Sequence, residues 1–65
     1  MRRQQLERHL VEHRCAVLRE GTRHTVWHNA DADARATLPW HSEIPVGAAR
    51  TICRLLAVPP PPTRG

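Results

Sequence analysis

Phenylalanine and tyrosine are absent from this 65-residue chain, and two tryptophans are its aromatic side chains. A core must therefore be built from Leu, Val, Ile, Ala and Cys together with the tryptophans. At this length the buried surface barely offsets the entropy lost by the chain on folding. We therefore expect one small domain with a thin core, whose fold gains from a bound partner.

Cysteines and long apolar runs are scarce as well. Cys15 and Cys53 are too few for the disulfide framework of a secreted mini-domain, and we expect both to be small core residues. No apolar run approaches the roughly 20 residues that a membrane span needs. Arg2 and Arg3 are not followed by the apolar stretch of a signal peptide. The expected protein is cytoplasmic and has no membrane contact.

Lysine is also missing, so ten arginines carry the positive charge against six acidic residues, for a net charge of +4. Such a balance in a small domain favours an anionic partner, either nucleic acid or an acidic protein. The planar guanidinium suits phosphate recognition. A lysine-free, alanine-rich chain is also what a GC-rich genome encodes, and that explanation stays open.

Hydrophobic periodicity divides the chain into a helix, three short strands and a second helix, at residues 2–13, 15–18, 24–28, 35–38 and 46–57. Gly21 and Thr22 predict the turn of a hairpin, residues 29–33 a polar loop, and Pro45 a helix start. The expected fold class is α+β in the order α-β-β-β-α. Its three-stranded antiparallel sheet carries both helices on one face, as in the double-stranded-RNA-binding fold. One domain covers residues 1–58, and residues 59–65 form a loose Pro-rich tail.

The predicted helices each present an apolar stripe to the core. The first stripe contains Leu6, Leu10 and His13, widened by Val11. The second contains Ala48, Ala49, Ile52, Leu55 and Leu56, whereas Arg50 and Arg54 share another face. Trp27 is expected in the core.

Five histidines are the candidate chemical groups, because imidazole exchanges protons near neutral pH. His9 and His13 have the spacing of a zinc pair, but further ligands are lacking and a solvated helix face is the expected location. His24 and His28 lie four residues apart on a strand, about 13 Å, and cannot share an ion. We expect no metal and no cofactor.

His24 is the histidine whose position suits catalysis. It follows Gly21, Thr22 and Arg23 at the rim of the predicted hairpin. A general base there can take the proton of a ribose 2′-OH, while a neighbouring cation stabilises the pentavalent phosphate. From the pattern alone, an ordinary surface histidine in a turn remains the competing interpretation.

Three stretches in register resemble one known family. Residues 19–27 read REGTRHTVW and are similar to the glycine-x-x-histidine hairpin of HicA-type toxins. Residues 38–44 read LPWHSEI and resemble the Pro-x-His-x-Glu-Ile loop of that family, which precedes a closing helix with Gly47 and ARTICRLL at 49–56. The first helix fits through LERHL at 6–10 with Glu12 and His13, so the likeness covers about residues 2–60.

The resemblance implies the toxin of a type II toxin–antitoxin system, with a double-stranded-RNA-binding-like fold and a HicB-type antitoxin as its partner. His24 stands at the family's catalytic position. We therefore expect an endoribonuclease that cuts single-stranded messenger RNA without a metal, leaving a 2′,3′-cyclic phosphate and a 5′-hydroxyl. The alternative is a non-catalytic RNA-binding or antitoxin-binding module. Thr22 and Arg14 stand where the family often has glycine.

Five further residues are candidates for RNA binding. Arg23 is expected to contact phosphate. Arg50 and Arg54 would clamp the RNA backbone or meet acids of the antitoxin. Trp40 would stack a base or fold inward, and His41 is a candidate second proton carrier. Solvent exposure without a function is the alternative for the arginines.

Overall fold

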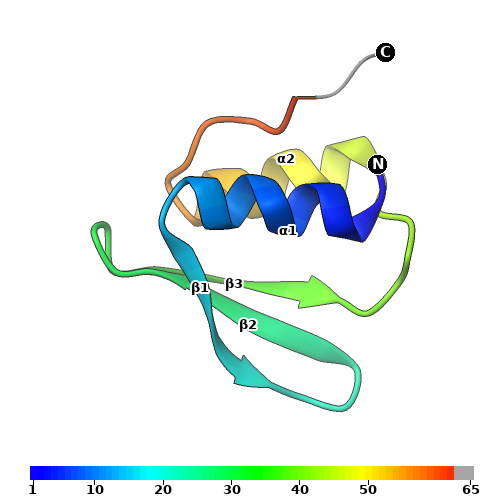
Figure 1. The fold of residues 1–65 in the computed structure, drawn as a ribbon, viewed down its shortest axis with the longest axis horizontal. Coiled ribbons are helices and arrows are strands. Elements are labelled where there is room, and N and C mark those ends of the chain that lie inside the picture. Colours follow the sequence, from blue (N-terminus) through cyan, green and yellow to red (C-terminus); the bar gives the residue numbers. More distant parts are fainter. Residues whose placement is uncertain (63–65) are drawn as a thin grey trace.

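Two helices and three strands follow one another in the predicted order in the computed structural model, which describes residues 1–62 (Figure 1). They are α1 (Arg3–Glu12), β1 (Cys15–Glu20), β2 (His24–Asn29), β3 (Ala34–Pro39) and α2 (Val46–Leu55). The strands form one antiparallel sheet in the order β1-β2-β3, and both helices lie on one face of it. The α+β class and the α-β-β-β-α order are confirmed. Within residues 1–62, neither helix is long and apolar enough to cross a bilayer.

The sheet has a buried and an open face because strand residues alternate in direction. In β2, Thr25, Trp27 and Asn29 are buried, whereas His24 is exposed and Val26 and His28 are half-buried. Thr25 pairs with Leu38 of β3 and Trp27 with Ala36, so the buried positions of both strands face the helices. No other segment within residues 1–62 covers the opposite side, which we call the open face (Figure 1).

The core lies between the sheet and the two helices. As expected, it contains Trp27, Cys15 and Cys53, together with residues from every element. The indole N–H of Trp27 donates to the Thr25 hydroxyl, 3.1 Å away, so no polar group is stranded there. The other buried apolar residues are Leu6, Leu10, Ala36, Leu38, Ile44, Ala49, Ile52 and Leu56.

Both apolar stripes are narrower than predicted. Val11 is 60% exposed and Leu55 is 56% exposed, and Ala48 is exposed as well. Each helix rests on a sheet of three strands and is covered from one side. Val11 is turned about 100° from Leu10 around the helix axis and so points off the sheet.

Asn29 belongs to β2 rather than to the polar loop in which the sequence placed it. Its side chain is 5% exposed, and its amide nitrogen donates to the Leu56 carbonyl at the end of α2, 2.7 Å away. Its amide oxygen accepts the backbone N–H of Asp31. One side chain therefore joins the β2–β3 turn to the last turn of α2.

His9 and the prolines after α2 contradict two further predictions. His9 is 7% exposed rather than solvated, and its Nε2 donates to the Pro59 carbonyl, 2.8 Å away. Its ring packs against that of His13, with 4.4 Å between centroids. Pro61 is buried, so residues 59–62 are not a loose tail. The rest of that predicted tail, 63–65, lies outside the described residues.

Candidate functional site

His24 is the first residue of β2 and its side chain is exposed on the open face. Its carbonyl accepts the backbone N–H of Gly21, 2.8 Å away, which closes the turn between β1 and β2. A Cβ added to Gly21 would stand 3.0 Å from that carbonyl oxygen and 3.9 Å from Nε2 of the His24 ring. A side chain at Gly21 would therefore have to displace the His24 carbonyl by a few tenths of an ångström, and the imidazole lies beside the turn.

The cation that shares a surface hollow with His24 is Arg19, which the sequence analysis did not select. Gly21, His24, Val26 and Arg19 line this hollow together with Glu20 and Thr22. Arg23, the predicted phosphate contact, does not line it; its side chain is exposed in the turn. We call this hollow the His24 hollow.

A β-bulge explains why Arg19 reaches the open face. Val17 pairs with Trp27, but the next pair is Arg19 with Val26, so that Leu18 is an extra residue in β1. Without the bulge, Arg19 would pair with Thr25 and would be on the face that the helices cover. Bulges re-aim side chains in this way and are frequent beside functional sites. The sequence predicted that the first strand ends at residue 18, whereas β1 continues to Glu20, and the one-residue shift in pairing leaves no mark in the apolar pattern.

Trp40 braces the turn before His24 from the end of β3. Its indole N–H donates to the Gly21 carbonyl at 3.1 Å, and its backbone N–H donates to the Arg23 carbonyl at 3.3 Å. Arg3 donates to the Trp40 carbonyl at 2.8 Å, and its guanidinium lies 4.8 Å from the centre of the indole ring. Trp40 as a whole is 43% exposed. Trp40 thus has a positioning role, and base stacking by its exposed part stays a prediction.

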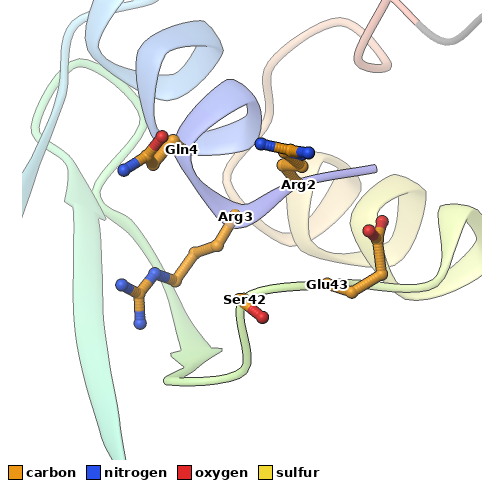
Figure 2. A pocket seen from close by; sticks show the side chains of 5 residues that line it. All are labelled: Arg2, Arg3, Gln4, Ser42 and Glu43. Carbon is orange, nitrogen blue, oxygen red and sulfur yellow. The ribbon is translucent and has the colours of Figure 1, made fainter.

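Arg3 reaches Trp40 because the chain start pairs with residues 42–44. The backbone N–H of Arg3 donates to the Ser42 carbonyl, and the Met1 ammonium lies 3.0 Å from the Glu43 carboxylate. A second surface hollow lies here, lined by Arg2, Arg3, Gln4, Ser42 and Glu43. In Figure 2 the Arg3 side chain extends toward the end of β3 and Glu43 points toward the chain start. These contacts hold the loop that carries Trp40 and the exposed His41.

Arg50 and Arg54 are exposed on one side of α2, as predicted, but in a different hollow. Cys53, Val58, Pro60 and Pro61 line that hollow with them. It shares no lining residue with the His24 hollow. The structure therefore brings His24 together with Arg19 and the Trp40 brace, and leaves the α2 arginines apart from them.

His9, His13 and the two cysteines occupy structural positions rather than a reactive site. His9 and His13 each donate to a backbone carbonyl through one ring nitrogen. Among residues 1–62, no three His, Cys, Asp or Glu side chains gather closely enough to hold a metal ion. Burial raises the pKa of the Cys15 thiol, and burial followed by the proximity of Cys15 raises that of Cys53. Both thiols are therefore poor nucleophiles at neutral pH.

Arg14 and Thr22, the two residues that stand in place of glycine in the resemblance described above, differ in backbone conformation. Arg14 has φ 66°, in the left-handed region that favours glycine. Thr22 is not among the described residues with positive φ, so the turn before His24 is formed without strain at that position.

The His24 hollow offers an exposed base, a guanidinium and a turn held by Trp40, open to solvent on the face of the sheet that no other part of the described chain covers. That set can take a proton and hold an anion, with the nucleophile supplied by the substrate. Comparison with protein-family models, curated proteins and solved structures finds no match to this chain.

Proposed function

We propose that this chain is an endoribonuclease that cuts single-stranded messenger RNA in the cytoplasm, with His24 as its general base. In this proposal it is the toxin of a type II toxin–antitoxin pair, neutralised by a HicB-type antitoxin. The observation that carries the proposal is the pairing of exposed His24 with Arg19 in one open hollow. The motif resemblance, which identified His24 independently, supports it.

The reaction needs one base and one cation. His24 takes the proton of a ribose 2′-OH, and the oxyanion attacks the adjacent phosphorus. Arg19 stabilises the extra negative charge of the pentavalent phosphate, because its guanidinium binds two phosphate oxygens at once. The bond to the 5′-oxygen breaks and this oxygen takes a proton from the solvent, while protonated His24 releases its proton to the solvent, so that one proton is taken up for each one released. The products are a 2′,3′-cyclic phosphate and a 5′-hydroxyl, and the step consumes no water.

The test of the base compares wild type, His24→Ala and His28→Ala on an RNA without secondary structure. His24→Ala should lower kcat about 10²- to 10⁴-fold, the usual contribution of a general base. Because His24 is exposed, its truncation should cost less than about 1 kcal/mol of stability, measured by thermal melts. His28→Ala should retain kcat at saturating RNA. Wild-type rates in His24→Ala would refute the assignment, as would a loss that only reflects unfolding.

The test of the cation compares Arg19→Gln with Arg23→Gln, which removes the same charge a few residues away. Arg19→Gln should lower kcat at least tenfold, and Arg23→Gln should leave it nearly unchanged. Equal effects of the two changes would contradict the role given to Arg19. An RNA that binds but is never cut, by wild type or variants, would instead favour a non-catalytic RNA-binding module.

A further inference from the structure

The open face of the sheet carries cations beyond the His24 hollow. On β3, Arg35 pairs with His28, and Thr37 pairs with Val26. Among the described strand positions that alternate to this face, two are arginines, two are histidines and none is acidic. These positions are Ala16, Arg19, His24, Val26, His28, Arg35, Thr37 and Pro39.

The charges lie along one diagonal of the face. Arg19 on β1 is opposite Val26, whereas Arg35 on β3 is opposite His28, two residues further along β2. Neighbouring strands lie about 4.8 Å apart, so the diagonal crosses the whole sheet. Val26 and Thr37 form the uncharged middle. The acids nearby are at the margin: Asp33 lies 3.4 Å from His28 with its side chain 89% exposed, and Glu20 lines the rim of the His24 hollow.

We propose that single-stranded RNA binds across this open face, from the His24 hollow to Arg35. The proposal rests on the function proposed above and adds the path of the substrate. Arg35 contacts a phosphate away from the cleaved bond, and His28 stacks against a base. Imidazole and guanidinium planes are surfaces on which unpaired bases stack. A duplex keeps its bases inside the helix and cannot use them, so the face selects a single strand.

This path leaves the arginines of α2 outside the RNA site. Arg54 is exposed like Arg35, but it lines the hollow beside Pro60 and Pro61 in the helix layer. Arg54→Gln therefore removes the same charge as Arg35→Gln without touching the open face. The pair separates a specific path from general attraction of RNA to a basic protein.

Binding is measured in the His24→Ala chain, so that the RNA stays intact, with a labelled single-stranded RNA and its duplex as probes. Arg35→Gln and His28→Ala should each weaken binding of the single strand about fivefold. Arg35→Gln should also lower the slope of log affinity against log salt by about 0.7. Arg54→Gln should change neither, and the duplex should bind more weakly. Equal losses for Arg35→Gln and Arg54→Gln, or tighter binding of the duplex, would overturn the path.

A cleavage assay on the chain with His24 intact separates this proposal from the proposed function. His24-dependent cleavage with equal affinities of Arg35→Gln and Arg54→Gln overturns the path alone. Absence of cleavage with a selective loss in Arg35→Gln overturns the nuclease and supports an RNA-binding open face. If the single-stranded probe does not bind at all, both proposals are wrong.

Discussion

Gly21 lies in the turn before β2, where the backbone of His24 approaches it closely. Its N–H bonds the His24 carbonyl at 2.8 Å, and a Cβ would stand 3.0 Å from the same oxygen. Its carbonyl also accepts the indole N–H of Trp40. A side chain at Gly21 must push on the backbone of His24, the proposed base. Gly21 is itself held in place, because its own carbonyl is hydrogen-bonded to Trp40.

Replacing Gly21 with alanine should therefore lower kcat several-fold while the protein stays folded. The added methyl shifts the His24 backbone by a few tenths of an ångström, and small displacements of a catalytic group are costly. Gly47→Ala is the matched control, because a Cβ there meets nothing within 4 Å. In α2 it should raise stability by about 0.5–1 kcal/mol and leave kcat unchanged. Steady-state cleavage and thermal melts measure both effects; unchanged kcat in Gly21→Ala would contradict the argument.

At the scale of elements, both helices end on a residue in the left-handed conformation that is not glycine. Arg14 follows α1 with φ 66°, and Ala57 follows α2 with φ 57°. After α2, the N–H of Val58 bonds the Cys53 carbonyl and that of Ala57 bonds the Arg54 carbonyl, the pattern of a Schellman motif. The turn at Ala57 directs the following prolines back toward His9. Arg14 and Ala57 each end a helix in this left-handed conformation, which carries a steric cost for a residue with a side chain.

Glycine at either position should stabilise the protein. Arg14→Gly and Ala57→Gly should each raise the free energy of unfolding by about 1 kcal/mol, because glycine adopts positive φ without a steric penalty. The Arg14–Asp31 ion pair is 3.6 Å long and mostly exposed, so its loss subtracts little. Thr22→Gly is the control: its φ is not positive, and it should bring no gain. Denaturant titration of the three variants decides; destabilisation by Arg14→Gly would contradict the interpretation.

At the scale of the whole molecule, the two buried thiols can be used to measure how tightly the helices pack on the sheet. Cys15 begins β1 and Cys53 lies in α2, and both are buried free cysteines. Burial raises the pKa of each above its ordinary value of 9.0. The folded protein therefore keeps both thiols neutral at a pH at which the unfolded chain ionises them.

Stability should accordingly be independent of these thiols below about pH 9 and fall as pH rises beyond it. Replacing both Cys15 and Cys53 with alanine should remove the part of this pH-dependent loss of stability that the thiols cause. The cavities left by the two replacements should lower the free energy of unfolding at every pH. Alkylation of the native protein should be slow at pH 8 and should become fast in denaturant. Fast labelling of the native protein would show that the two layers open readily, against the burial described here.

The sequence by itself determined the elements, because their signals are local. The short run from His24 to His28 after the Gly21–Thr22 turn signal predicted β2, the apolar spacing of Leu6 and Leu10 predicted α1, and proline marked the start of α2. The same local information made His24 a candidate by its place after Gly21, and its expected catalytic role came from the family resemblance.

Only the tertiary structure decided which groups surround His24 and which are buried. Arg19 reaches the open face through one extra residue in β1, and strand register depends on pairing with β2 rather than on the pattern of β1 alone. Trp40 meets Gly21, and His9 meets Pro59, across 19 and 50 residues of sequence. Such contacts leave no periodic signal, because they form only when distant segments are brought together by the core.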